Sequence, residues 1–340
     1  MASETWAENA KSVYAGRYPL RSLLFFDLFL VAVIILATRL ATLFHEILGH
    51  AFTAFLFGEH VNAVRLSLFG GGRVYYHLNI PPDTLPRFFV AFGGIIMNVL
   101  SGILALIILN RVRHGSGWAP FILFFGMVSL MGAVGYTTLG FYYEVGDPVS
   151  WIAGHSPAVG GLWFPFLLAS PFISYAVIKR YAEILGRYFP ARHFRDRLVS
   201  VVMTLGISLC VYAGLYEVTN QHATALDSPA LAARHAEERI IAMKRDTLFQ
   251  KLRSTHPEMA IERIKEWVAQ TPIAVRPHEV PKKFPLKPVI ALLFALGALM
   301  AIGRAKKYVD SAPLSLSHET LFWAVFLAAA VIGAIALMDG

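Results

Sequence analysis

The feature that most constrains this chain is an apolar stretch of 35 residues, from Leu23 to Phe57. As a single helix it would be about 52 Å long, which exceeds the roughly 30 Å hydrocarbon core of a bilayer, so it must tilt, bend or protrude. The stretch contains two histidines and a carboxylate close together, at His45, Glu46 and His50. Because ionisable groups are costly in hydrocarbon, their presence here predicts a functional site.

The two histidines are five residues apart, whereas the metalloprotease pattern H-E-x-x-H places them four apart on one helix face. On an ideal α-helix, the rings of His45 and His50 would point about 140° apart. A π-bulge brings residues i and i+5 onto one face, so a metal site here predicts a π-bulge between them. Without it, Glu46 and His50 share one face of the α-helix. That face would be a polar stripe that lines a contact between helices, formed by Arg39, Thr42, Glu46, His50 and Thr53.

Two further ionisable residues lie in the same stretch. Asp27 is near its start, and we expect it at the membrane interface. Arg39 lies in the middle and needs a partner, for which a carboxylate such as Glu46 is one candidate. Such a pair would lower the value of Glu46 as a base.

The composition is that of a polytopic membrane protein. The chain is 56% hydrophobic and only 15% charged, whereas soluble proteins average about a quarter charged. Its net charge of +8 does not indicate nucleic acid, because membrane proteins gather Lys and Arg in short cytoplasmic loops and no basic-aromatic motif occurs. Cys210 is the only cysteine, which excludes an intrachain disulfide and a cysteine-based metal site. We expect membrane lipid, and no nucleic acid, among its partners.

The hydropathy pattern predicts an all-α polytopic membrane protein with about seven transmembrane helices and a short β-hairpin after the first. The hairpin is expected over 61–80, where two short strands flank a glycine turn and polar and apolar residues alternate in the second strand, 73–80. The six later spans are expected at 89–110, 119–141, 162–178, 198–216, 288–303 and 321–338.

The chain divides into five segments on this basis. In order they are an N-terminal interfacial segment, a membrane core with spans one to three, spans four and five, a soluble helical segment, and the last two spans. Their ranges are 1–22, 23–160, 161–216, 217–286 and 287–340. In the soluble segment we expect a helix over 230–253 and a second one that opens with a capping box at Thr255 and ends at Gln270.

The basic loops indicate the topology. Seven spans with a cytoplasmic N-terminus place the most basic loops on one side, among them 179–197 with six basic residues. We expect the membrane to be a bacterial inner membrane. The same topology places the far ends of spans one and three on one side, so Asp147 can meet His45 and His50.

Four pieces of the sequence occur in an order that resembles a known family. They are His45-Glu46…Gly49-His50, the segment Gly58 to Tyr76 with its glycine-rich turn, the element Gly94…Asn98, and Asp147. Over roughly residues 24–150 this order resembles the site-2 protease family of intramembrane zinc metalloproteases. The resemblance implies a Zn²⁺ ion held by His45, His50 and Asp147, with Glu46 as the catalytic base.

Such a site would hydrolyse a peptide bond of a membrane-embedded protein substrate. Three protein ligands leave a fourth position of a catalytic zinc for water. Glu46 would take a proton from that water and pass it to the leaving amine. Asn98 is a candidate donor to the oxyanion or a helix-packing residue, and the hairpin is either an ordinary surface element or an edge that holds the substrate extended.

Several alternatives stay open. The first is a catalytically inactive relative that serves as a membrane scaffold or as a subunit of a membrane complex. If no π-bulge forms, another histidine (His60, His77 or His155) could replace His45, in a set closer to a non-haem iron or structural site. Glu144 competes with Asp147 as the third ligand. A transporter is disfavoured, because no repeated pair of broken spans occurs.

Overall fold

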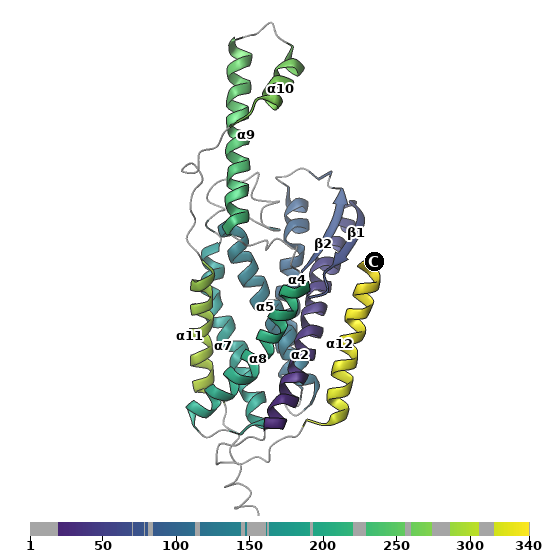
Figure 1. Cartoon of the computed structure of the whole chain (residues 1–340), viewed down its shortest axis with the longest axis vertical. Coiled ribbons are helices and arrows are strands. Elements are labelled where there is room, and N and C mark those ends of the chain that lie inside the picture. The colour runs from purple at the N-terminus through teal and green to yellow at the C-terminus, as the bar shows by residue number, and fades with distance from the viewer. Residues whose placement is uncertain are drawn as a thin grey trace, which may run out of the picture.

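In the computed structural model of the protein, the apolar N-terminal stretch forms one helical rod in three parts (Figure 1). These are the α-helix α2 (Leu20–Leu43), the π-helix η1 (Phe44–Ala51) and the short α-helix α3 (Phe52–Leu56). The rod ends at Gly58, whose φ of 77° is a left-handed conformation that favours glycine. There the N–H groups of Gly58 and Glu59 donate to the carbonyls of Phe55 and Ala54, which closes the helix and turns the chain into the hairpin.

The structure describes thirteen ranges of the chain. They are 20–69, 71–77, 79–80, 84–112, 116–143, 147, 161, 163–190, 193–219, 229–255, 260–273, 286–305 and 316–339. Most of the N-terminal interfacial segment expected at 1–22 therefore lies outside the described residues.

The predicted hairpin is confirmed. Strand β1 (His60–Leu66) pairs in antiparallel fashion with β2 (Gly72–His77), and an irregularity in the register falls between Val61 and Ala63. Five long helices follow in the bundle: α4 (Leu85–Leu109), α5 (Trp118–Tyr143), α7 (Trp163–Tyr188), α8 (Phe194–Thr219) and, later, α11 (Lys287–Arg304). The last helix is α12 (His318–Asp339).

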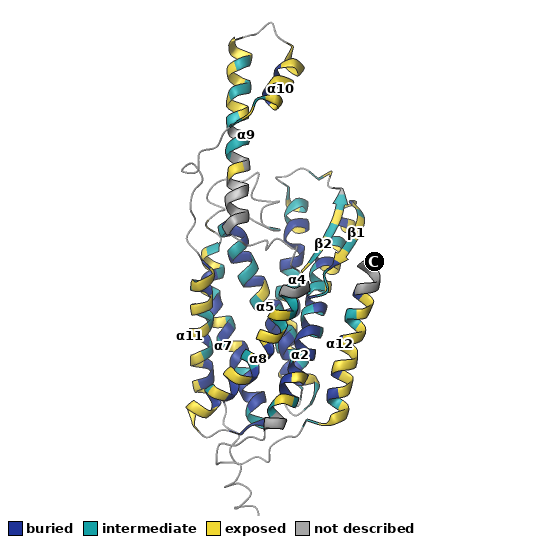
Figure 2. Cartoon of the chain, viewed as in Figure 1, coloured by how far each residue is buried: buried dark blue, intermediate teal, exposed yellow. Residues whose placement is uncertain are grey.

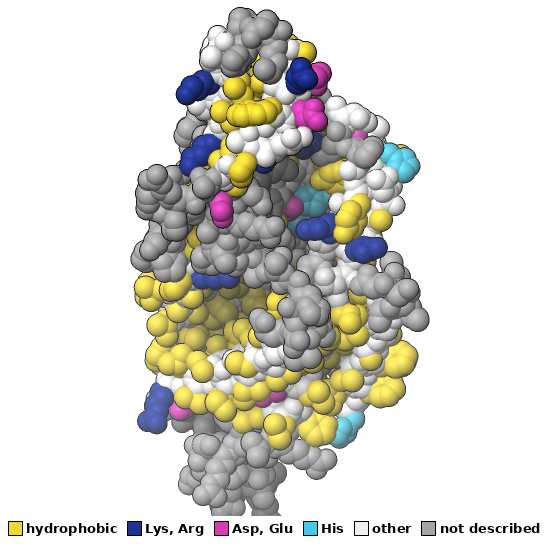
Figure 3. Space-filling view, turned by 45° about the horizontal axis from the view of Figure 1, so that its top comes forward, with side chains coloured by type: hydrophobic (Ala, Val, Ile, Leu, Met, Phe, Trp, Pro, Cys, Tyr) yellow, Lys and Arg dark blue, Asp and Glu magenta, His cyan; other side chains and the backbone are white. Residues whose placement is uncertain are grey.

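The bundle has the character of a membrane protein. Among the described residues, six helices are long and apolar enough to cross a bilayer; they span 23–56, 85–109, 118–143, 194–216, 287–304 and 318–335. Hydrophobic side chains cover its flank in Figure 3. The core runs along α2, where Phe26, Phe29, Leu30 and Ile34 are fully buried against the surrounding helices (Figure 2).

The fourth expected span, 162–178, lies in α7, which is longer than predicted. The helix continues to Tyr188, so the first half of the basic loop expected at 179–197 is helical. Tyr181, Ile184 and Leu185 continue its buried face, and Arg180 forms an ion pair with Glu183 one turn later. Buried packing therefore extends the helix through a stretch whose charges made it look like a loop.

A helical arm projects from the end of the bundle at which the hairpin lies (Figure 1). It consists of α9 (Pro229–Thr255), as predicted, and α10 (Ile261–Gln270), which buries Ile264 and Val268. The predicted start of the second helix was wrong. Thr255 is the last residue of α9, and α10 begins after Ala260.

Candidate metal centre

The π-helix η1 sets the direction of the two histidines. Its eight residues include both His45 and His50, and the predicted π-bulge is thereby confirmed. In a π-helix the hydrogen bonds join residues five apart, so residues i and i+5 lie on one face. The two ring centroids are accordingly only 4.9 Å apart. The additional residue between the histidines is absorbed by the backbone, and both rings point into the bundle.

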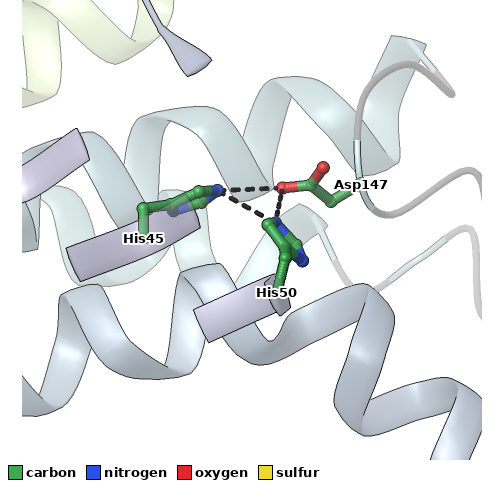
Figure 4. Close-up of side chains that lie close together, drawn as sticks. All are labelled: His45, His50 and Asp147. Atoms are coloured by element: carbon green, nitrogen blue, oxygen red, sulfur yellow. Dashed lines mark hydrogen bonds and ion pairs between the residues drawn. The ribbon is translucent and has the colours of Figure 1, made fainter. Parts of the chain in front are cut away.

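Three ligand atoms converge at this face (Figure 4). Nε2 of His45 and Nε2 of His50 each lie 3.1 Å from Oδ2 of Asp147, and the two nitrogens are 3.2 Å apart. Asp147 follows the C-terminal end of α5, so the prediction that spans one and three end on the same side is confirmed. The structure thus brings together the three residues that the sequence predicted as ligands.

His50 is held in one tautomer. The residue is buried, and its Nδ1 lies 2.7 Å from the backbone carbonyl oxygen of Val90 in α4. A carbonyl can only accept, so Nδ1–H donates the hydrogen bond, and in the neutral imidazole that a metal requires the lone pair is then on Nε2. Metal-binding histidines are generally oriented by such a bond from the other ring nitrogen.

His45 is oriented from α4 as well. Nδ2 of Asn98 lies 3.1 Å from Nδ1 of His45, while the buried Oδ1 of Asn98 has no hydrogen-bond partner among the described residues. A half-turn of the amide exchanges these two atoms and lets Oδ1 accept from Nδ1–H. Nε2 of His45 then keeps its lone pair, as a metal ligand requires. The unpartnered oxygen therefore fits a site in which His45 is a ligand.

Asp147 is fixed through its backbone. Its N–H donates to the hydroxyl of Tyr136 in α5 at 3.1 Å, and the Tyr136 ring meets that of His45 edge to face. Burial alone would raise the pKa of the Asp147 carboxyl, but the adjoining imidazoles of His45 and His50 outweigh it and lower the pKa. Asp147 is thus an ionised carboxylate at neutral pH.

The donor set fits zinc. A tetrahedral ion with bonds of about 2.0 Å holds its ligand atoms about 3.3 Å apart. The three atoms here are 3.1 to 3.2 Å apart, and each offers a lone pair. Two neutral imidazoles and one carboxylate are a ligand set of catalytic zinc sites.

Three glycines allow α4 to approach η1. A Cβ at Gly49 would meet the backbone of Gly94, one at Gly93 would lie 2.5 Å from the Gly49 carbonyl oxygen, and one at Gly94 would lie 2.5 Å from Cδ2 of His45. Gly94 and Asn98 are one turn apart on the same face of α4. Helix packing was one role expected of Asn98 from the sequence. The structure shows that the group packed against Gly94 and Asn98 is the His45 ring.

Glu46, the predicted base, is buried beside the ligands with an exposed fraction of 6%. The hairpin covers it, because a Cβ at Gly72 would lie 2.5 Å from Cγ of Glu46. Arg39 has a partner other than the expected carboxylate: its Nη1 donates to the backbone carbonyl of Ser67 at 2.5 Å. Asp27, which was expected at the membrane interface, is buried within the bundle.

Of the alternative ligands, only the side chain of His60 lies within the described residues. His60 lies on β1, where its Nδ1 is 2.8 Å from Oδ1 of Asn62. Glu144 and His155, and the side chain of His77, lie outside the described residues. The roles of Tyr136 and of the Val90 carbonyl were not predicted from the sequence, because a contact made by or to the backbone leaves no signal in residue type.

Comparison with known families agrees with this arrangement. Residues 22–141 match the family described as Peptidase M50B-like. The resemblance to the site-2 protease family is confirmed. The matched segment covers the rod, the hairpin, α4 and almost all of α5, and ends before Asp147. No curated protein and no solved structure matches the chain. The site-2-protease-like core is thus joined to a second half without a matched counterpart.

Proposed function

We propose that this protein is an integral-membrane zinc metallopeptidase that hydrolyses a peptide bond of a membrane-embedded protein substrate. The observation that carries the proposal is the convergence of His45 Nε2, His50 Nε2 and Asp147 Oδ2 beside the buried Glu46. The family match supports the same reaction class. The π-helix removes the main objection from sequence, since the five-residue spacing still directs both rings to one point.

A zinc ion held by these ligands supplies a Lewis acid that lowers the pKa of water to about 7. The other roles belong to the chain. Val90 and Asn98 hold the two imidazoles in the tautomers that leave Nε2 free, and Asp147 contributes the ionised carboxylate. Glu46 accepts the proton of the attacking water and delivers it to the leaving amine. Because Asn98 is engaged with His45, its contact favours a positioning role over that of an oxyanion donor.

The hairpin is the part of the site that meets the substrate in this proposal. A helical substrate shields its carbonyls, so it has to be extended before cleavage. The two-stranded sheet offers unpaired edges to which an extended peptide can add as a further strand. Gly72 at the start of β2 lies against Glu46, so the sheet adjoins the proposed base. We place the protein in a bacterial inner membrane, with the cytoplasmic N-terminus that the basic loops predict.

The test is a Glu46→Gln variant compared with wild type in liposomes that contain a library of single-span peptides. New peptide ends are measured by mass spectrometry, and bound zinc is measured on the same preparations. We expect cleavage to fall about 10²- to 10⁴-fold with zinc retained, because a general base is lost while the ligands remain. Glu183→Gln is the matched control, since Glu183 is equally buried but pairs with Arg180.

Cleavage by Glu46→Gln at the rate of wild type would refute the catalytic role. Absence of cleavage in wild type, with zinc bound, would favour the inactive scaffold or complex subunit.

A further inference from the structure

The loop that joins the two strands of the hairpin is tied to two helices that are far apart in sequence. From α2, Nη1 of Arg39 donates to the carbonyl of Ser67 at 2.5 Å. From α8, the hydroxyl of Tyr212 donates to the carbonyl of Phe69 at 2.7 Å. The N–H of Ser67 donates to the carbonyl of Gly71 at 3.0 Å, which closes the loop on itself. The loop is therefore held by two helices at its Ser67 and Phe69 carbonyls.

These anchors are buried and connected to one another. Arg39 is 4% exposed and is hydrogen-bonded to Tyr212, while the Phe69 side chain is buried against the Tyr212 ring edge to face. A buried guanidinium in a membrane helix is expensive, so its retention calls for a function. Here it bonds to a loop carbonyl and to the hydroxyl that binds a second carbonyl of the same loop.

The residue that follows the closed loop is the one that contacts the proposed base. Gly71 accepts the closing hydrogen bond, and Gly72 packs on the Glu46 side chain, with its backbone within hydrogen-bonding range of the carboxylate. A shift of the loop would therefore move Gly72 and free the carboxylate. Tyr212 lies outside the segment 22–141 that matches the family, so a helix from the unmatched half reaches the site.

We propose that Arg39 and Tyr212 are positioning residues that hold the hairpin loop so that Gly72 fixes the Glu46 carboxylate beside the metal ligands. This inference rests on the proposed function for its catalytic consequence, but the anchor itself is a structural statement. Both residues act through the loop, by their bonds to the carbonyls of Ser67 and Phe69. Enzymes lose rate steeply when a catalytic group is misplaced by about 1 Å.

The test uses full-length Tyr212→Phe, which removes one hydroxyl and keeps the ring that packs on Phe69. The matched control is Tyr181→Phe, which also loses a buried hydroxyl hydrogen bond, at 2.6 Å to Thr204, but lies away from the hairpin. Hydrogen–deuterium exchange of residues 60–77, bound zinc, kcat and KM are measured for both. We expect faster exchange in the hairpin and a kcat about 10- to 100-fold lower in Tyr212→Phe, with KM and zinc unchanged.

The results separate the two proposals. If hairpin exchange in Tyr212→Phe equals that in Tyr181→Phe, the anchor is overturned whether or not the enzyme is active. If exchange rises but kcat stays the same, the positioning role is overturned. If wild type has no peptidase activity, the proposed function fails, and hairpin exchange still decides the anchor. Arg39→Gln gives an independent variant on the other helix, with the same expected changes.

Discussion

Two regions of this bundle bury ionisable residues of the first helix, and they differ in what surrounds them. At the hairpin end, His45 and His50 converge on Asp147, and each ring also has a partner on α4. In the first half of the rod, Asp27 is 6% exposed and its Oδ1 has no hydrogen-bond partner among the described residues. The nearby Ser208 hydroxyl donates to the backbone carbonyl of Asp27, not to its carboxylate.

The comparison shows that a buried charge in a membrane helix does not by itself make a site. The rule that an ionisable residue in hydrocarbon is functional applies equally to both regions. What distinguishes the first is that ligand atoms from the rod and from the chain beyond α5 meet at one point, while α4 sets the tautomers. Asp27, by contrast, contributes a single carboxylate. The hydroxyl groups of Tyr181 and Thr204 are hydrogen-bonded to each other.

The largest effect on the first region is expected from Gly94→Ala. The added Cβ would lie within 2.6 Å of three atoms of the His45 ring, so the ring has to move. Metal–nitrogen bonds tolerate only about 0.2 Å, and we therefore expect zinc affinity to fall by more than about 100-fold. Zinc titration in detergent measures this. Gly132→Ala is the control, because a Cβ there meets nothing within 4 Å; equal zinc affinity in both variants would contradict the packing argument.

A smaller effect is expected from Asn98→Ala. Loss of the group that orients a ligand histidine typically weakens metal binding by about 10- to 100-fold. Asn98→Asp sharpens the test, since its carboxylate can still accept from Nδ1–H of His45. We expect zinc affinity to be retained in Asn98→Asp and reduced in Asn98→Ala. The reverse order would mean that the amide N–H, and not the oxygen, is what His45 needs.

The smallest effect is expected from Asp27→Asn. The amide is nearly isosteric and replaces a buried carboxylate whose Oδ1 has no hydrogen-bond partner among the described residues. The free energy of unfolding in detergent should therefore stay the same or rise by about 1 kcal/mol. Zinc content should be unchanged, because Asp27 is in the first half of the rod and the ligands are in the second. A loss of zinc in this variant would show that the two regions are coupled.

Much of the first region was predictable from sequence. The apolar run, the residue types and the order of motifs indicated the ligands, and the five-residue spacing itself required the π-helix. The sequence could not show that Gly94 packs on the His45 ring or that the Val90 carbonyl orients His50. Those contacts depend on how α4 crosses η1, and on backbone groups that every residue type carries.

Other features depended on tertiary packing. Asp27 was expected at the interface because it is close to the start of the apolar run, and the sequence did not show that neighbouring helices bury its side chain. Arg39 looked like a partner of a carboxylate, but its bond to Ser67 appears only when the hairpin folds back on the rod. In both cases the local sequence predicted the correct helix, but not the groups that pack against the residue.

The most direct test of the central claim is the zinc content of the chain purified in detergent without chelator, measured by mass spectrometry. Wild type is compared with His50→Ala and Asp147→Ala, and with His60→Ala as a control whose imidazole lies on the hairpin away from the ligands. We predict about one zinc per chain in wild type and in His60→Ala, and little in the two ligand variants. No zinc in wild type, or zinc undiminished in both ligand variants, would contradict a centre formed by His45, His50 and Asp147.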